Sequence, residues 1–219
     1  MRIDPAGWPF ILVTALLAVP AALVGGRWAA VPILVLAVAF LLFFRDPSRP
    51  PPAEPGAVVS PADGRVLVAG PAVAEAAPPG AWQQISIFLS PLDVHVNRVP
   101  ASGTITRVDF RPGRFLPAYH ADADRLNERS EIWLDHEGQT VVFRQVVGAL
   151  ARRVVCRLAS GRRVAAGERF GVMKFGSRMD VFLPVTATLC VEAGNRVKAG
   201  VTIVARFGDA PGRGPSAGA

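Results

Sequence analysis

The sequence predicts a mainly β domain that follows an N-terminal apolar helical hairpin. Three features predict this arrangement: two charge-free apolar runs at the start of the chain, a proline-rich segment after them, and short apolar runs beyond it that Gly and Pro interrupt. The chain has 219 residues, of which 51% are hydrophobic. That composition excludes global disorder, and the length suits one sizeable core.

The N-terminal segment 1–44 is predicted to be a membrane-associated hairpin. Residues 10–24 hold 13 apolar side chains in 15 positions, residues 28–44 hold 16 in 17, and neither run has a charge. A 17-residue helix reaches about 25 Å, slightly less than the roughly 30 Å hydrocarbon layer, so the hairpin either spans twice or dips in and returns. A signal peptide is disfavoured because a second apolar run follows at once. A buried helical pair of a soluble protein remains the alternative.

The charge pattern indicates which side of the membrane the domain occupies. Arg45 and Arg49 follow the second apolar run, so the positive-inside rule places the domain on the cytoplasmic side of the cell membrane. Trp8 and Trp28 are candidate interface anchors. The net charge is +7, without the aromatic interleaving of a nucleic-acid module. An anionic membrane is therefore a better partner than nucleic acid.

The rest of the chain divides into a linker, a β-domain and a tail. Residues 45–56 hold five prolines and predict a stiff linker, 57–208 form the domain, and 209–219 are predicted to be disordered. A helix is predicted at about 149–158, with apolar residues on one face. Strands are predicted at 64–69, 83–89, 103–110, 130–135, 140–147, 180–184, 188–192 and 201–207.

A short repeat lies within the domain. The pattern G-x-x-V-x-x-G occurs at 161–167 and again at 194–200, 33 positions later. A turn of this kind followed by a strand resembles the elements of barrel-sandwich hybrids of the biotinyl/lipoyl type. The resemblance implies a barrel-sandwich-hybrid-like β-domain with few helices.

Three short stretches carry the residues suited to chemistry: 60–64, 89–100 and 175–180. They supply the carboxylate of Asp63, the imidazole of His95 and the hydroxyl of Ser177, which together make the set needed to activate a serine. Taken singly, each also fits a turn or a buried histidine. Ser177 lacks the G-x-S-x-G surroundings of a nucleophile elbow. Cys156 and Cys190 form no C-x-x-C pair, so we expect buried reduced thiols and no metal.

These stretches resemble the phosphatidylserine decarboxylase proenzyme family in its short form. The resemblance covers most of 56–207, and its last motif is highly specific. The matching text is SPADG at 60–64, SPLDVHVNRVP at 90–100, AYH and NERSE within 118–131, VVGALARRVV at 146–155 and GERFGVMKFGSRMDVFLP at 167–184.

The resemblance implies that the chain cleaves itself between Gly176 and Ser177. His95 would take the proton of Ser177, and Asp63 would orient the imidazole. Chains 1–176 and 177–219 would remain together as a heterodimer, with a higher oligomer left open. Ser177 would become a pyruvoyl group that forms a Schiff base with phosphatidylserine, releasing CO₂ and phosphatidylethanolamine without pyridoxal phosphate or metal.

One position departs from the pattern of longer family members. They carry a second histidine three positions after the first, and here that residue is Arg98. Either His95 serves both processing and decarboxylation, or His120 supplies the later proton. Candidate contacts for the lipid headgroup are Arg98, His120, Arg152 and Arg153.

Three other functions remain open at this point. An archaetidylserine decarboxylase would have the same core and act on an ether lipid. A biotinyl/lipoyl-type membrane carrier or adaptor is suggested by Met173-Lys174, which resembles half of a biotinylation hairpin, although no Met follows the lysine. A membrane-bound serine hydrolase would use Ser177 without cutting the chain.

Overall fold

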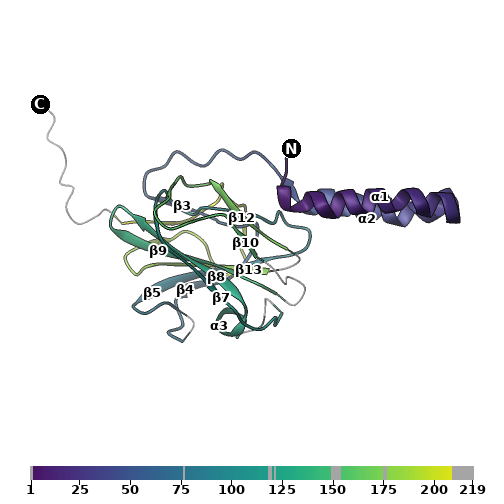
Figure 1. Cartoon of the computed structure of the whole chain (residues 1–219). Coiled ribbons are helices and arrows are strands. Elements are labelled where there is room, and N and C mark those ends of the chain that lie inside the picture. The colour runs from purple at the N-terminus through teal and green to yellow at the C-terminus, as the bar shows by residue number, and fades with distance from the viewer. Residues whose placement is uncertain are drawn as a thin grey trace, which may run out of the picture.

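The computed structural model describes residues 2–75, 77–117, 120, 122–148, 154–174 and 177–208 (Figure 1). Strands make up most of the ordered structure, and two helices at the N-terminus form an apolar hairpin. Both parts of the predicted fold class, the mainly β domain and the hairpin, are confirmed. The predicted tail at 209–219 lies outside the described residues, as do Gly176, Arg152 and Arg153.

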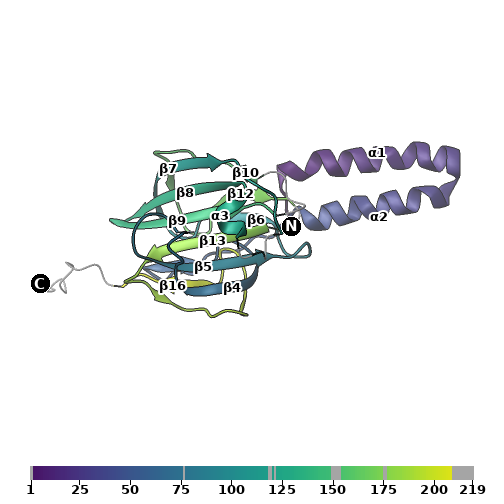
Figure 2. The same cartoon turned by 90° about the horizontal axis from the view of Figure 1, so that it is seen from below.

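The hairpin extends from the β-domain as a separate rod (Figures 1 and 2). A short 3-10 helix η1 (Pro5–Gly7) leads into α1 (Trp8–Gly25), and α2 (Arg27–Phe43) returns to the domain. Gly26 makes the turn with φ of 75°, a backbone conformation that favours glycine. The segment Pro5–Gly25 has a mean hydropathy of 2.1 and is long enough to cross a membrane, whereas α2 is shorter, with 17 residues.

The outward faces of both helices are exposed rather than packed on the domain. Leu23 is 81% exposed and Val24 is 90% exposed at the far end of the rod. A helical pair buried in the core of a soluble protein would not leave such side chains in water. This exposure argues against the soluble alternative.

The base of the hairpin is fastened to the domain at both ends. Strand β1 (Arg2–Ile3) pairs antiparallel with β2 (Arg45–Asp46), so the chain entering α1 lies beside the chain leaving α2. Asp4 accepts two hydrogen bonds from Arg157, at 3.0 and 2.7 Å, and its N–H donates to the carbonyl of Phe44. The backbone contacts join the two ends of the hairpin to each other, and the pair of Arg157 with Asp4 holds its base against the domain.

The β-domain contains fourteen described strands and one short helix, α3 (Ala123–Leu126). The strands are β3 (Ala57–Val59), β4 (Gly64–Pro71), β5 (Trp82–Leu89), β6 (Val96–Arg98), β7 (Gly103–Arg111), β8 (Arg129–His136), β9 (Gln139–Val146), β10 (Val154–Cys156), β11 (Arg163–Val164), β12 (Arg169–Met173), β13 (Ser177–Pro184), β14 (Thr188–Leu189), β15 (Arg196–Val197) and β16 (Ile203–Arg206). Each predicted strand corresponds to one of these.

The helix predicted at about 149–158 is wrong in its described part. Residues Val154–Cys156 form strand β10, which pairs antiparallel with Gly171–Met173 of β12. The apolar spacing fits a helix, but two consecutive valines also suit a strand, and a neighbouring strand edge supplies the backbone partners. The prediction that both cysteines are buried is also wrong, because Cys190 is exposed and Cys156 is half-buried.

The sheets are arranged as two similar halves. The eight-stranded sheet has the order β11-β7-β8-β9-β13-β5-β4-β15, and the three-stranded sheets have the orders β10-β12-β6 and β14-β16-β3. The two halves of the large sheet match strand by strand from the edges to the centre: β11, β7, β8 and β9 on one side correspond to β15, β4, β5 and β13 on the other. The two small sheets match in the same way, β10-β12-β6 with β14-β16-β3. The domain therefore has an internal twofold pattern, with β9 and β13 side by side at its centre.

The sequence repeat occupies equivalent places in this pattern. The first copy forms β11 at one edge of the large sheet, and the second forms β15 at the other edge. The N–H of Gly161 donates to Ile105 at 2.7 Å, and the N–H of Gly194 donates to Val66 at 2.8 Å. Each repeat thus closes one edge of the sheet by the same backbone contact.

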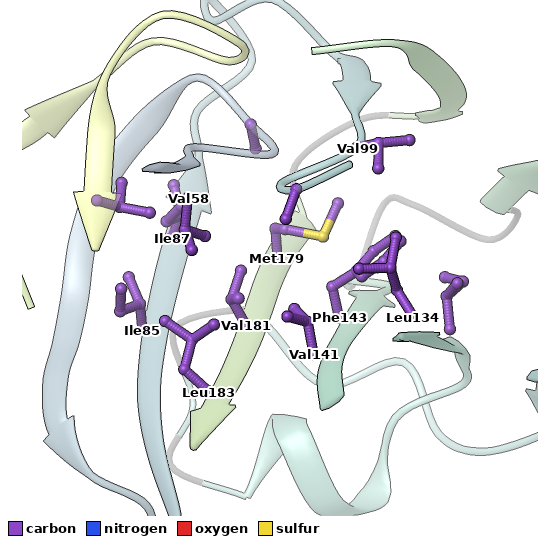
Figure 3. Close-up of a cluster of buried hydrophobic side chains, with 14 of the residues drawn as sticks. Val58, Ile85, Ile87, Val99, Leu134, Val141, Phe143, Met179, Val181 and Leu183 are labelled. Carbon is purple, nitrogen blue, oxygen red and sulfur yellow. The ribbon is translucent and has the colours of Figure 1, made fainter. Parts of the chain in front are cut away.

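The core lies on one face of the large sheet (Figure 3). Side chains alternate along β13, so Met179, Val181 and Leu183 enter the core beside Ile85 and Ile87 of β5. All five are fully buried. Burying a side chain of this kind contributes roughly 1.5–3 kcal/mol, so β13 is fixed by its packing as well as by its backbone pairing.

Candidate active site

Backbone contacts bring the three motif stretches together. The N–H of Arg98 donates to the carbonyl of Pro61 at 2.9 Å, which joins the second stretch to the first. The N–H of Met173 donates to the carbonyl of His95 at 3.2 Å, and Ser177 is opposite Leu89 in the β13–β5 pair. Segments far apart in the sequence therefore meet at one end of the large sheet.

Ser177 is the first residue of β13 and is fully buried. Its Oγ has no hydrogen-bond partner among the described residues. Leaving a buried hydroxyl unpaired costs about 1–3 kcal/mol, so it needs a compensating reason. A catalytic role is one such reason. Only four residue steps separate Ser177 from Met173, which limits their Cα separation to about 14 Å.

His95 is a buried imidazole held in one orientation. Its Nδ1 lies 2.9 Å from the backbone carbonyl of Asp93, so in the neutral ring Nδ1 carries the proton and Nε2 is the acceptor. The Nε2 atom is buried and is unpaired within the described part of the chain. The ring of Phe43 stacks on the imidazole with 4.0 Å between centroids.

The surroundings of His95 keep its imidazole neutral near pH 7. Burial lowers its pKa to about 4, because a protonated ring would lose its hydration. The carbonyl and carboxylate of Asp93 and the carboxylate of Asp63 oppose this shift, and Arg45 adds to it. A neutral imidazole with a free Nε2 is the form that can accept a proton from a hydroxyl.

Asp63 lies in the turn before β4 and is paired with Arg49. Arg49 Nη2 donates to Oδ2 at 2.9 Å, Nη1 also contacts Oδ1, and the N–H of Ala199 donates to Oδ1 at 2.8 Å. The described hydrogen bonds of His95 and Asp63 do not join the two side chains. The carbonyl of Asp93 holds Nδ1 of His95, and the charge of Asp63 favours the protonated imidazole. The role of Asp63 in orienting His95 remains a prediction.

The candidate headgroup residues have separate surroundings. Arg98 is buried and donates to Asp46 at 3.1 Å, to Pro47 at 2.8 Å and to Gly167 at 3.0 Å, so its guanidinium fastens the linker to the domain. Burial lowers the pKa of Arg98. His120 is half-exposed, and its described hydrogen bonds stay within its own segment. Contact of either residue with a headgroup remains a prediction.

Sequence reasoning missed two parts of the site. Phe43 was part of an apolar run, and nothing in that run distinguished it from its neighbours. Arg49 was noticed only as a charge after the hairpin, and nothing in the linker sequence indicated that it would pair with Asp63. Within the described ranges, no group of three or more His, Cys, Asp or Glu side chains could hold a metal ion.

A cavity of about 580 Å³ is present in the domain, and Ser177 is not among the residues that line it. Residues lining it include Ser102, His136, Gln139 and Phe207. The internal twofold pattern relates this place to the candidate site. Ser102 Oγ accepts from the N–H of Ala166 at 2.9 Å, as Asp63 accepts from Ala199. Strand β9 begins with Gln139 where β13 begins with Ser177, so the position equivalent to Ser177 carries an amide instead of a hydroxyl.

Comparison with known proteins agrees with this arrangement. The family model "Phosphatidylserine decarboxylase" matches residues 36–205, which include all three motif stretches. A phosphatidylserine decarboxylase proenzyme of Pelodictyon phaeoclathratiforme is 46% identical over 202 residues, covering 90% of this chain and 94% of the relative. The proenzyme of Salinibacter ruber is 49% identical over 187 residues, covering 80% and 81%. The proenzyme of Chlorobium limicola is 40% identical over 215 residues, covering 94% and 100%. With a family model matched over most of its length, the chain belongs to the phosphatidylserine decarboxylase family.

Proposed function

We propose that this chain is a membrane-bound phosphatidylserine decarboxylase whose Ser177 becomes a pyruvoyl group after self-cleavage. The family and the names of the relatives support the reaction. One observation carries the residue assignment. Ser177 Oγ and His95 Nε2 are both buried without a described partner. Ser177 is opposite Leu89, which begins the motif stretch of His95, and His95 accepts a backbone hydrogen bond from Met173 of β12, the strand before β13.

Self-cleavage uses the hydroxyl and the imidazole. Ser177 Oγ attacks the carbonyl carbon of Gly176 while His95 Nε2 accepts the hydroxyl proton, and the acyl group moves from nitrogen to oxygen. Elimination of the ester then releases the carboxylate of Gly176 and leaves dehydroalanine at position 177. Hydrolysis of that residue takes up water and releases ammonia, which leaves the pyruvoyl group at the start of the small chain.

The start of β13 fits a pyruvoyl group. By the alternation of β13, Ser177 lies on the same face as Met179, Val181 and Leu183, and backbone pairing with Leu89 of β5 fixes this residue. When formed, the group supplies a carbonyl that withdraws electrons from the bound amine. His95 is a neutral base held by the carbonyl of Asp93, and we assign both proton transfers to it. His120 is the weaker choice, because its described contacts lie in an exposed segment.

The two chains would stay together after cleavage. Residues 177–219 contribute β13, which pairs with β5 on one side and β9 on the other, and β16, which pairs with β3. Met179, Val181 and Leu183 anchor the small chain in the shared core. A heterodimer of large and small chains follows from this interlocking.

The hairpin provides the membrane attachment. Its exposed apolar faces would lie among lipid tails, and both helix ends return to the domain on one side. Arg45 follows Phe44, the C-cap of α2, so the domain is assigned to the cytoplasmic face. Phosphatidylserine in that leaflet would then lie close to the base of the hairpin.

Intact mass spectrometry tests this function. Wild-type protein purified from membranes should give chains 1–176 and 177–219, the small one lighter by one ammonia, whereas Ser177→Ala should stay whole. Matured protein should release CO₂ from phosphatidylserine and act more slowly on the ether-linked lipid. An intact, unmodified wild-type chain would contradict the proposal and favour the hydrolase or carrier functions.

A further inference from the structure

The last residue of the membrane hairpin touches the candidate base. Phe43 ends α2, and its ring lies over the imidazole of His95 with 4.0 Å between centroids and 28° between planes. Phe43 is 7% exposed and His95 is fully buried. The stack therefore covers one face of the imidazole with an apolar ring.

A second contact joins the same two segments. Arg45 Nη1 donates to the carbonyl of Leu42 at 2.6 Å, and its Nη2 donates to the carbonyl of Leu92 at 2.7 Å. Leu92 belongs to the turn in which the Asp93 carboxylate accepts from Ser90 N and Oγ. The carbonyl of Asp93 then holds the Nδ1 of His95. The end of α2 and the turn that orients the imidazole are therefore linked.

Phe43 is also part of a packed aromatic group at the hairpin base. Its ring meets that of Phe44 edge-on at 5.0 Å, and Phe10 of α1 lies 5.5 Å from Phe44 and 5.4 Å from Phe40. Phe44 is fully buried. A change in how the two helices sit on the domain would therefore move the ring that covers His95.

We propose that Phe43 is a positioning residue of the active site, which fixes the plane of the His95 imidazole and excludes water from one face of it. The β-domain alone would leave this site incomplete, and docking of the membrane hairpin completes it. The inference rests on the proposed function, in which His95 is the base.

The groups around the imidazole determine how the pKa of His95 should change when the ring of Phe43 is removed. Asp93, from the turn before β6, and Asp63, from the turn before β4, favour the protonated imidazole, and Arg45 of β2 disfavours it. Burial is the largest influence and lowers the pKa of His95. Replacing Phe43 by a smaller side chain admits water, so the pKa should rise toward its ordinary value near 6.5.

The test measures self-cleavage against pH in the full-length chain. Protein is made by cell-free synthesis in the presence of phosphatidylcholine vesicles, moved to buffers from pH 4 to 8, and sampled for uncut chain. For Phe43→Leu we expect the acid limb of the rate profile to move up by about one pH unit or more, because water reaches the imidazole. The rate at pH 8 should fall by a smaller factor than the rate on the acid limb, because the imidazole is neutral there but no longer held in one plane. Phe43→Tyr keeps a stacking ring and should restore the profile.

Two controls separate positioning from general damage. Phe40→Leu removes a ring that packs on Phe10 in the same base and should leave the acid limb in place. The imidazole pKa of His95, measured by NMR in Ser177→Ala precursors with and without Phe43→Met, reports the effect without any cleavage. An unmoved acid limb in Phe43→Leu, or an equal slowing at every pH, would overturn the inference.

A variant of the base distinguishes this inference from the proposed function. His95→Gln should remain uncut at every pH. If it cleaves like wild type, the proposed function fails in its choice of base. If it stays uncut while Phe43→Leu keeps the wild-type profile, only the positioning role of Phe43 fails.

Discussion

The carboxylate of Asp63 is paired with the guanidinium of Arg49, with 2.9 Å between Nη2 and Oδ2. The side chains of Arg49 and Asp63 are 13% and 12% exposed, so the pair is largely shielded from water. Arg49 belongs to the segment that leaves the hairpin, whereas Asp63 belongs to the turn that precedes β4. The pair therefore fastens the linker to the motif turn and neutralises a charge near His95.

Replacing Arg49 by Met should destabilise the precursor. The carboxylate of Asp63 would keep the N–H of Ala199 but lose its cationic partner, at a cost of about 1–3 kcal/mol. Urea unfolding of Arg49→Met in a Ser177→Ala background measures the loss. Arg65→Met is the control, because Arg65 is exposed on β4. Equal losses of unfolding free energy in the two variants would show that the ion pair does not stabilise the precursor.

The stability of the precursor should depend on pH through His95. The folded-state pKa of about 4 lies below the ordinary value of 6.5, so the unfolded chain binds more protons between these values. The contribution of the neutral imidazole to the free energy of unfolding should be complete above pH 6.5 and be lost as the pH falls toward 4. The loss should be about 1.4 kcal/mol per pH unit, on the order of 3 kcal/mol in all.

Urea unfolding at a series of pH values checks this dependence. Ser177→Ala is compared with the double variant that also carries His95→Gln, so that both chains remain uncut. The difference between their free energies of unfolding should narrow as the pH falls through this range. A constant difference would mean that the imidazole is not buried in its neutral form.

Gly64→Ala should damage the domain far more than Gly70→Ala. Both glycines lie in β4 with nearly the same φ, 152° and 153°, so the backbone strain of a side chain is matched. A Cβ at Gly64 would lie 2.0 Å from the carbonyl oxygen of Phe88, whereas at Gly70 it would meet nothing within 4 Å. We expect a difference of about 2 kcal/mol or more in thermal or urea unfolding, since β4 must shift away from β5. Similar stabilities would show that the strands can separate at little cost.

Arg157→Ala should loosen the base of the hairpin. Arg157 makes two hydrogen bonds to Asp4, whose side chain is buried, and Asp4 also accepts from the N–H of Ala6 at the start of η1. Removing the guanidinium leaves a buried carboxylate without its charged donor, which costs about 1–3 kcal/mol. Limited proteolysis of vesicle-bound protein should cut near residues 2–8 faster than in wild type. Arg163→Ala, at an exposed position of β11, should leave the cutting rate unchanged.

Much of the fold could be predicted because its signals are local. The hairpin follows from two charge-free apolar runs, and the strands follow from alternating or β-branched segments between Gly and Pro. The helix predicted at about 149–158 is wrong at 154–156 because that prediction also used local signals alone. Its apolar spacing fits a helix, and only the edge of β12, which the local sequence does not reveal, selects the strand.

Sequence alone determined which residue types are available for the chemistry: a hydroxyl at Ser177, an imidazole at His95 and a carboxylate at Asp63, each within a specific motif. Tertiary structure decided which groups these residues meet. It paired Asp63 with Arg49, oriented His95 by the carbonyl of Asp93 and covered it with Phe43 from the hairpin. Such partners depend on how distant segments pack. A side chain's neighbours, and with them its pKa, are set by the closure of the whole core rather than by the residues beside it in the chain.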